Sequence, residues 1–254
     1  MISMIPPSLP RNSTLLKTFI EKAGGRKVFL EHEVKGLMKA MGFPVPRGRF
    51  IRKGEGIMPH DELPFPLVAK VSSSAIASKS DVHGIRIGLK SEEELAVAVA
   101  DLMSIEGAEG VLVEEMAPPG LEVVVGGTSD GQFGPIVMFG LGGIFVELFK
   151  DIAFALAPLK KDEALWLVRA VKGYRLLEGY RGSLTVDLKS LTELLVGISE
   201  LMATGLIEEI DLNPVALYPE GAMILDAKML AALSSENAPF LGLTQTGVSS
   251  VEVS

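Results

Sequence analysis

Residues 208–228 read EEIDLNPVALYPEGAMILDAK and carry the most specific pattern in the chain. Short apolar runs in and around this stretch predict strands over 206–211, 215–218 and 222–227. Because neighbouring antiparallel strands bring their ends together, we expect Asp211, Asn213 and Asp226 to meet at one end of the pair. Oxygen donors of this kind, together with water and nucleotide phosphates, are what Mg²⁺ prefers. Solvated strand ends are the alternative, and the paired pattern favours the metal site.

Upstream, residues 139–147 read FGLGGIFVE, a glycine-rich run inside apolar sequence. Gly142 and Gly143 have no Cβ, so the backbone there can approach an anionic group closely. The spacing is neither GxGxxG nor that of a P-loop, which ends in GK[ST]. A glycine-rich β-turn explains the same run equally well.

A candidate phosphate contact lies nearer the N-terminus. Lys70 ends the run FPLVAK, where a lysine on a buried strand can direct a compact positive charge at phosphate oxygens. A strand-end lysine that reaches out to water is the alternative. Taken alone, the alternative is the more common case.

A candidate adenine contact follows in the chain. Residues 111–116, VLVEEM, predict a strand that leads to a Pro-Pro-Gly connector at 118–120. Such a strand end can offer backbone groups of Glu114, Glu115 and Met116 to the edge of a base. A core strand followed by a turn is the alternative. Glu122 can accept from ribose hydroxyls or be a solvated strand residue.

The chain contains three histidines, and one of them is a candidate for catalysis. His32 lies in a helical pattern and is interpreted as structural, while His60 lies among loop prolines. His83 follows Lys79 by a few residues, between a serine-rich loop and a predicted strand. A partly exposed histidine at a strand edge is the alternative. We recognise neither a Ser–His–Asp set nor a histidine pair at metal-ligand spacing.

The succession of elements predicts an α+β fold of two lobes. Predicted helices cover 15–41 (divided at Gly24-Gly25), 91–103, 160–171 and 188–203. Further predicted strands cover 48–52, 67–71, 84–89, 110–116, 121–128, 135–139, 144–149 and 151–155. The expected divisions are a tail at 1–14, one domain at 15–234 and a second tail at 235–254. Within the domain we expect a smaller lobe at about 45–115 and a larger lobe at about 116–234, with the N-terminal helices packed on the larger one.

Composition excludes several kinds of chemistry. There is no cysteine, which rules out disulfides, thiolate nucleophiles and cysteine metal sites. The formal net charge of −8 argues against a general nucleic-acid binder, although a local basic pocket remains compatible with it. The longest nearly uncharged run, 131–146, is shorter than the ~20 residues that a membrane-spanning helix needs. The N-terminus lacks an apolar core of signal-peptide length. We therefore expect a cytoplasmic protein without membrane segments.

Several segments together carry a family resemblance, which covers roughly residues 28–230. They resemble the β subunit of archaeal ADP-forming acyl-CoA (acetyl-CoA) synthetases, an ATP-grasp protein related to the β chain of succinyl-CoA synthetase. The segments are LEHEVKGLMKAMGFPVPRG (30–48), FPLVAKV (65–71), KSDVHGIRIGLKSEEEL (79–95), the stretch from VLVEEM through FGLGGIFVE to Asp151, and 208–228.

This resemblance implies an ATP-grasp fold whose two lobes clasp ATP or ADP with Mg²⁺. It also implies a partner, an α subunit that carries the CoA-binding and acyl-transfer domains, commonly in an α2β2 assembly. The implied reaction is acyl-CoA + ADP + phosphate ⇌ acid + CoA + ATP, in which the β subunit passes a phosphoryl group from a partner phosphohistidine to ADP.

The resemblance also implies roles for individual positions. Lys70 matches the phosphate-binding lysine, and Glu122 an acidic position on the ribose side. Glu114, Glu115 and Met116 match the adenine hinge. Gly142 and Gly143 match the glycine turn near the phosphates. Asp211, Asn213 and Asp226 match the magnesium end, and Asp211 is also placed in the catalytic set.

One departure from the family pattern concerns the phosphoryl carrier. The family usually reads HKSD, whereas here Ser78 precedes Lys79-Ser80-Asp81. Three interpretations follow: His83 has taken over the carrier role, the partner's phosphohistidine reaches the nucleotide directly, or the chain is a paralogue with weak or no synthetase activity. The last corresponds to a regulatory subunit that binds nucleotide and a partner. A different ATP-grasp ligase, such as a carboxylate–amine ligase, lacks support in the motifs.

Overall fold

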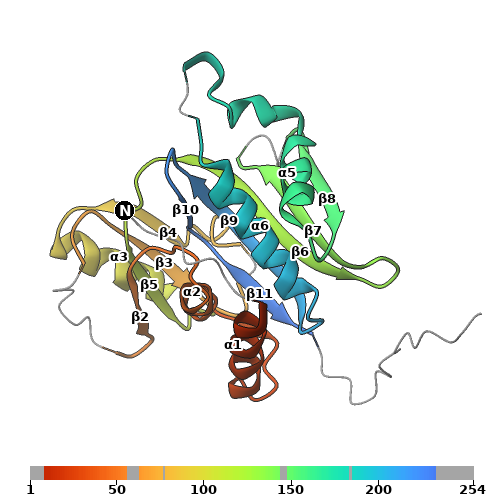
Figure 1. The fold of residues 1–254 in the computed structure, drawn as a ribbon. Helices are drawn as coiled ribbons and strands as arrows, with labels where there is room; N and C mark the ends of the chain where they lie inside the picture. The colour runs from red at the N-terminus through yellow and green to blue at the C-terminus, as the bar shows by residue number, and fades with distance from the viewer. Residues whose placement is uncertain (1–8, 56–62, 77, 144–147, 183–184, 233–254) are drawn as a thin grey trace, which may run out of the picture.

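The computed structural model describes residues 9–55, 63–76, 78–143, 148–182 and 185–232. They form two sheets joined side by side, as Figure 1 shows. No helix in these ranges is long and apolar enough to cross a bilayer.

The small lobe is a four-stranded sheet in the order β2-β5-β3-β4. Its strands are β2 (Gly48–Arg52), β3 (Leu67–Ser72), β4 (Ile85–Leu89) and β5 (Gly110–Glu115). Helix α3 (Glu92–Ser104) packs its apolar side on this sheet, with Leu95, Val99 and Leu102 buried. The helix begins where the sequence predicts, because the Ser91 hydroxyl accepts a hydrogen bond from the Glu94 N–H at 3.2 Å.

The large lobe is a seven-stranded sheet in the order β1-β11-β9-β6-β7-β8, with β10 paired to β9. Its strands are β1 (Val28–Phe29), β6 (Leu121–Asp130), β7 (Gly134–Leu141), β8 (Ile152–Leu156), β9 (Ile207–Leu217), β10 (Ala222–Ile224) and β11 (Lys228–Ala231). Helices α5 (Lys161–Arg169) and α6 (Leu188–Met202) cover one face, and short 3₁₀ turns at Lys172–Leu176 and Tyr180–Gly182 connect them.

Alternation along the strands decides which face of the large sheet is covered. Val125 and Phe139 pair across β6 and β7, and both are fully buried beneath the helices. Their sequence neighbours face the other way, because successive strand residues point to opposite faces. Asp211 on β9 is paired with Gly126 and therefore lies on the opposite, helix-free face.

Helix α2 (Glu31–Ala40) lies where the two lobes meet, close to β2 of one sheet and β11 of the other. Its residues Val34, Leu37 and Met38 are buried in the core of the large lobe. Glu31 and Lys35 are buried as well. Helix α1 (Leu9–Lys22) packs against both α2 and α6.

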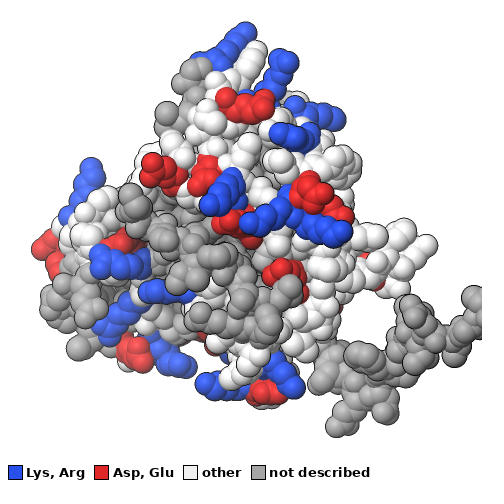
Figure 2. All heavy atoms as spheres, in the orientation of Figure 1, with Lys and Arg blue, Asp and Glu red and all other residues white. Residues whose placement is uncertain are grey.

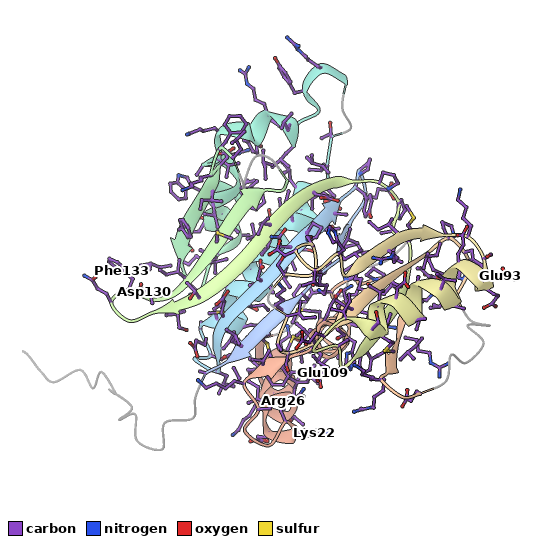
Figure 3. All side chains as sticks on the ribbon, turned by 180° about the vertical axis from the view of Figure 1, so that it is seen from behind. Lys22, Arg26, Glu93, Glu109, Asp130 and Phe133 are labelled. Atoms are coloured by element: carbon purple, nitrogen blue, oxygen red, sulfur yellow. The ribbon has the colours of Figure 1, made fainter. Side chains whose placement is uncertain are left out.

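Figure 3 shows the molecule from behind. Arg26, which follows α1, and Glu109, which precedes β5, lie near each other where the lobes meet. The hairpin between β6 and β7, marked by Asp130 and Phe133, projects away from the small lobe. The lobes therefore meet through α2 and the strands beside it. The small lobe does not reach the β6–β7 hairpin at the far end of the large sheet.

The structure differs from the sequence-based expectations in several elements. Helix α1 begins at Leu9 and so includes part of the expected tail; Pro10 suits a first turn, where its missing N–H has no helical partner. The strands predicted at 206–211 and 215–218 form one strand, β9. Of the strand predicted at 222–227, only 222–224 form a strand, β10, and the connector that follows donates from the Leu225 and Asp226 N–H groups to the Pro214 carbonyl before β11 begins at Lys228. Most of the strand predicted at 144–149, His60 and the expected tail at 235–254 lie outside the described residues.

Candidate nucleotide site

A cleft of about 370 Å³ opens between the lobes. Its walls come from β3 and β4, the connector between β5 and β6, the middle of β9, and the connector between β10 and β11. This volume lies within the usual range for small-ligand sites, roughly 300–1,000 Å³. Six of the residues predicted from the sequence line it: Lys70, Glu114, Glu115, Met116, Glu122 and Asp226.

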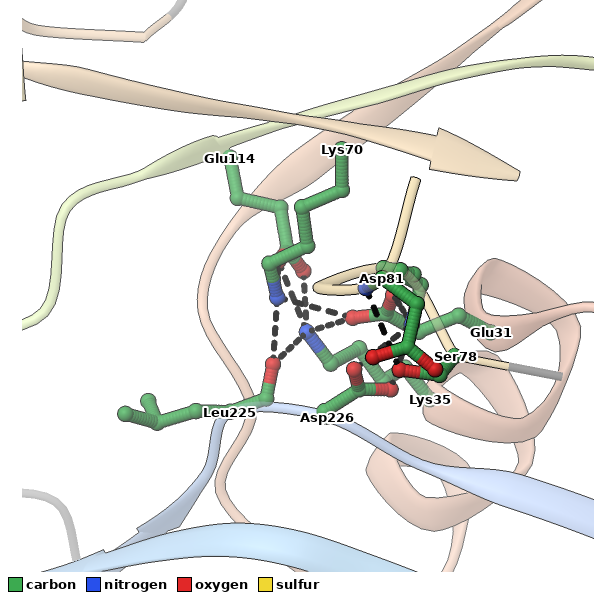
Figure 4. A network of polar contacts seen from close by, with 9 residues as sticks. Glu31, Lys35, Lys70, Ser78, Asp81, Glu114, Leu225 and Asp226 are labelled. Atoms are coloured by element: carbon green, nitrogen blue, oxygen red, sulfur yellow. Dashed lines mark hydrogen bonds and ion pairs between the residues drawn. The ribbon is translucent and has the colours of Figure 1, made fainter. Parts of the chain in front are cut away.

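The cleft is bounded on one side by a buried ionic network, drawn in Figure 4. The Lys70 ammonium on β3 lies 2.8 Å from Glu31 Oε1 and 2.8 Å from Glu114 Oε2. It also donates to the Leu225 carbonyl at 2.5 Å. The Lys35 ammonium on α2 contacts the same three groups, at 2.7 Å from Glu31, 2.7 Å from Glu114 and 2.6 Å from the Leu225 carbonyl.

A third lysine completes the network at its large-lobe end. The Lys79 ammonium donates to both oxygens of Asp226, at 2.8 and 2.6 Å, and lies 2.7 Å from Glu31 Oε2. The lysines Lys35, Lys70 and Lys79 expose only 4%, 8% and 9% of their surfaces. Three ammonium groups therefore balance the carboxylates of Glu31, Glu114 and Asp226 in a site largely closed to water.

The network favours the charged forms of Glu31, Lys70 and Lys79. Burial alone would raise the pKa of Glu31, but the ammonium groups of Lys70, Lys35 and Lys79 outweigh it and lower that pKa well below its usual value. Burial alone would also lower the pKa of Lys70, and Glu31, Glu114 and Asp226 raise it instead. The same balance, set by Glu31 and Asp226, raises the pKa of Lys79. Burial instead lowers the pKa of Lys35, despite the nearby carboxylates of Glu31 and Glu114. Because these charges are buried, removal of one partner is costly.

In the adenine hinge predicted at 114–116, several polar groups already have partners within the protein. The Glu114 side chain points into the lysine network, and the N–H groups of Glu115 and Met116 donate to the carbonyls of Arg47 and Pro66 at 2.9 and 3.1 Å. These N–H groups are therefore used inside the small lobe. Because Pro118 and Pro119 have no N–H, the backbone donors that this connector can offer to a base are those of Ala117 and Gly120, which both line the cleft.

Glu122 and the glycine turn lie side by side. The Gly142 N–H donates to the Glu122 carbonyl at 2.8 Å, and a Cβ on Gly142 would lie 2.8 Å from that same oxygen. Gly143 adopts a φ of +61°, which favours glycine. The turn therefore has a structural reason for its glycines, and residues 144–147, which follow it, lie outside the described residues.

The predicted metal ligands lie where the pairing of β9 with β11 ends, since Asp211 on β9 pairs with Lys228, the first residue of β11. Asp226 lies in the connector between β10 and β11, whose Leu225 and Asp226 N–H groups donate to the Pro214 carbonyl at 3.0 and 3.4 Å. Asp211 is partly buried on β9, and Asn213 is exposed beside Pro214. Burial raises the pKa of Asp211, and the nearby charge of Asp226 adds to this effect.

Carboxylate and amide oxygens are the kind of ligand that a divalent cation such as Mg²⁺ prefers. The described residues contain no group of three His, Cys, Asp or Glu side chains placed to hold a metal. Protein donors would therefore be Asp226, Asp211 and the Asn213 amide, with nucleotide phosphates and water completing the shell. Asp226 does attract a positive charge in this conformation, since an ammonium group lies against both of its oxygens. The Lys79 ammonium therefore marks Asp226 as a carboxylate that holds a cation in this conformation.

The carrier candidates lie in the turn between β3 and β4. Ser78 is partly buried, and its hydroxyl accepts a hydrogen bond from the Asp81 N–H at 3.4 Å. His83 is exposed, with a φ of +49°, and its carbonyl accepts from Arg86 at 2.6 Å. Lys79, in the same turn, reaches the predicted metal ligand Asp226 and donates to both of its oxygens.

Three members of the network, Glu31, Lys35 and Lys79, were not among the site residues predicted from the sequence. A signal for the first two was present, since Glu31 and Lys35 are four residues apart and share one face of α2 with buried Val34 and Met38. Charged residues that extend an apolar helix face indicate a buried polar site. His32, interpreted as structural, stacks on Phe50 with ring centroids 3.9 Å apart.

Comparison with known proteins identifies the family of the chain. A family model described as an ATP-grasp domain matches residues 21–230, so the chain belongs to the ATP-grasp family. The ATP-grasp fold predicted from the sequence is thereby confirmed.

Within the ATP-grasp family, proteins similar to this chain are ligases and synthetases that act with CoA. The chain is 38% identical to "Acetate–CoA ligase [ADP-forming] I subunit beta" of Pyrococcus furiosus, over 84% of this chain and 97% of that one. It is 42% identical to "Acetate–CoA ligase [ADP-forming] II" of Archaeoglobus fulgidus, but the match spans only 30% of that longer protein. A solved structure of acetyl-coenzyme A synthetase 1 from Ca. Korarchaeum cryptofilum, with coenzyme A and Ca-AMPCP, is 40% identical, with a TM-score of 0.78 over 87% of this chain and 99% of that one. The predicted resemblance to ligase β subunits is confirmed.

Proposed function

We propose that this chain is the nucleotide-binding β subunit of an ADP-forming acyl-CoA synthetase. Its role is to pass a phosphoryl group between a phosphohistidine of a partner subunit and ADP. The observation that carries the proposal is the cleft between the lobes, where Lys70, the 114–120 connector and Asp226 converge from distant parts of the sequence. The β-subunit relative of nearly the same length supports it.

Different residues along the cleft suit the base, the ribose and the phosphates of a nucleotide. The apolar wall formed by Val68, Ile87 and Ala216 suits the faces of a base, and the Ala117 N–H suits its edge. Glu122, which also lines the cleft, suits ribose hydroxyls as an acceptor. Lys70, at the inner end of the cleft, can exchange its carboxylate partners for phosphate oxygens, as the charge of a phosphate outweighs that of a carboxylate.

Asp226, Asp211 and Asn213 would hold the metal at the phosphate end of the cleft. A divalent cation bound there supplies neutralisation of crowded phosphate charge. In the transfer step, the P–N bond of the partner's phosphohistidine breaks and a bond forms between phosphorus and a β-phosphate oxygen of ADP. The buried lysines lower the cost of bringing these anions together.

The proposal is tested by calorimetric titration of the chain with ADP in the presence of Mg²⁺. Wild type should bind, and Asp226→Asn should lose about tenfold or more in affinity, a change of about 1.4 kcal/mol, because a neutral amide is a weaker ligand for a divalent cation than a carboxylate. Asp162→Asn removes an exposed carboxylate of α5 on the far face of the large sheet and should bind like wild type. Equal affinities in all three proteins would refute the assignment of Asp226.

The route of the phosphoryl group is a separate question, because Ser78 stands where the family has histidine. We propose that any carrier within this chain is His83, since an imidazole is nucleophilic near neutral pH, whereas a hydroxyl needs an adjacent base. The exposed position of His83 leaves it accessible. A weakened or regulatory paralogue is the second candidate, and it is favoured by the same serine.

Labelling with γ-labelled ATP distinguishes these routes. An acid-labile, base-stable label should form on wild type and on Ser78→Ala, and should be absent from His83→Ala. A label that survives in His83→Ala contradicts the carrier role. Absence of label from every variant, in protein shown to bind ATP, favours direct transfer from the partner or the regulatory paralogue.

A further inference from the structure

Lys79 joins the two lobes at the metal end of the cleft. It belongs to the small-lobe turn between β3 and β4, while Asp226 belongs to the large lobe and Glu31 to α2. Its ammonium lies within 2.8 Å of both Asp226 oxygens and 2.7 Å from Glu31. This contact connects parts of the chain that are 147 residues apart.

The ammonium occupies the oxygens that a metal needs. Mg²⁺ binds its oxygen ligands at about 2.0–2.1 Å. An ammonium hydrogen-bonded to the same carboxylate would then lie only a few ångströms from the metal, where the repulsion between the two cations is strong in a partly buried site. Lys79 and a metal therefore compete for Asp226.

We propose that Lys79 is a placeholder cation, which neutralises Asp226 in the nucleotide-free chain and is displaced when metal–nucleotide arrives. It is a positioning residue rather than a catalytic one, because it acts through Asp226 and through its own turn. The inference rests on the proposed function and assigns to Lys79 a role that no spacing in the sequence indicated.

The displacement has a structural consequence for the carrier turn. The Lys79 carbonyl accepts from the Gly84 N–H at 2.6 Å, and the Ser80 carbonyl accepts from the His83 N–H at 3.1 Å, so the turn is closed on itself. At its far end the Gly84 carbonyl accepts from the Val71 N–H at 2.8 Å, and a Cβ on Gly84 would lie 2.4 Å from a Val71 methyl carbon.

One end of the turn is thus packed tightly against β3, while the other is held across the cleft by the Lys79 ion pairs. Loss of those ion pairs frees the turn to pivot about Gly84. Arrival of the metal would in this way move His83, which lies in the same turn, at the moment when phosphates are present to receive or donate a phosphoryl group.

The first test measures binding of Mn²⁺, used in place of Mg²⁺ because electron paramagnetic resonance reports its free concentration. Without nucleotide, Lys79→Met should bind Mn²⁺ about tenfold or more tightly than wild type, a change that corresponds to about 1.4 kcal/mol. Lys79→Arg keeps the competing charge and should resemble wild type. Lys35→Met removes one charge from the same network without freeing Asp226, and should gain much less affinity.

Unchanged or weaker Mn²⁺ binding in a folded Lys79→Met chain would overturn the inference. The second test, hydrogen exchange of wild type, does not depend on a variant. The amides of residues 78–84 should exchange slowly in the free chain and faster with Mn²⁺-ADP bound. In Lys79→Met they should exchange fast without any ligand.

If wild type binds Mn²⁺-ADP but the hydrogen-exchange rates of the amides at 78–84 do not change, the placeholder role of Lys79 is refuted. The proposed function would not be affected by that result. Failure of wild type to bind Mn²⁺-ADP at all would instead refute the proposed function, and the inference with it.

Discussion

At the residue scale, Glu31 is the centre of the ionic network. Its carboxylate contacts all three buried lysines, Lys35, Lys70 and Lys79. Because these ammonium groups are removed from bulk water, they depend on Glu31 for compensation. Loss of this single carboxylate would leave the remaining charges unbalanced.

We therefore expect Glu31→Gln to lower the free energy of unfolding at pH 7 by about 3–5 kcal/mol, the usual cost of breaking a buried ion pair from one side. Urea-induced unfolding at neutral pH measures this difference. Glu220→Gln, which removes an exposed carboxylate, is the matched control and should change stability little.

The same substitution should alter the dependence of stability on pH. The pKa of Glu31 is lower in the folded chain than its usual value of 4.5, so its contribution is fully present above that value and is lost as pH falls below it. Wild type and Glu31→Gln should therefore converge in stability towards acidic pH. A constant difference between them down to pH 3 would contradict this account.

At the element scale, α2 determines where the two lobes meet. One side of it packs into the core of the large lobe, and the same helix supplies Glu31 and Lys35 to the cleft. Its stability should therefore be coupled to the geometry of the site. Gly36 lies in this helix, exposed, and a Cβ added to it would meet nothing within 4 Å.

We expect Gly36→Ala to raise the free energy of unfolding by about 0.5–1 kcal/mol, because alanine loses less backbone entropy in a helix. Gly197 in α6 gives the opposite case, since its Cβ would lie 2.4 Å from the Phe43 ring. Gly197→Ala should destabilise by about 1–3 kcal/mol through overpacking. Chemical unfolding of both variants tests the pair, and the same sign of change in both would count against this packing.

At the scale of the whole molecule, the chain forms one nucleotide-binding unit of two lobes. Charged side chains of both signs are interspersed over the face in Figure 2 rather than gathered by sign. The chain spans about 30% of the length of the single-chain Archaeoglobus relative, but 97% of the Pyrococcus β subunit. The Archaeoglobus relative therefore contains a large part of sequence that does not match this chain.

We expect this polypeptide alone to form no ATP from acyl-CoA, ADP and phosphate, and to do so when mixed with its α subunit. A coupled assay for ATP measures both conditions, with the Asp226→Asn chain plus α subunit as control. Turnover by the isolated wild-type chain would show that the partner is dispensable.

Much of this architecture was predictable from sequence because the signals are local. Strand β2 was predicted with its observed bounds, and α3 begins at the capping residue Ser91, since alternation and side-chain caps depend on near neighbours. The resemblance of the longer segments to ligase β subunits identified the family. It also selected Lys70 and Asp226, which the structure places on the same cleft.

The ionic partners were decided by the tertiary structure alone. Lys79 and Asp226, or Lys35 and Glu114, meet only after both lobes have folded against α2, and no spacing along the chain encodes which carboxylate each lysine finds. The same holds for the continuous strand β9, because its pairing with β6 outweighs the interruption that Pro214 suggested. Local sequence determines elements through near-neighbour sterics and hydrogen bonds, whereas buried charges are matched by the three-dimensional packing that removes them from water.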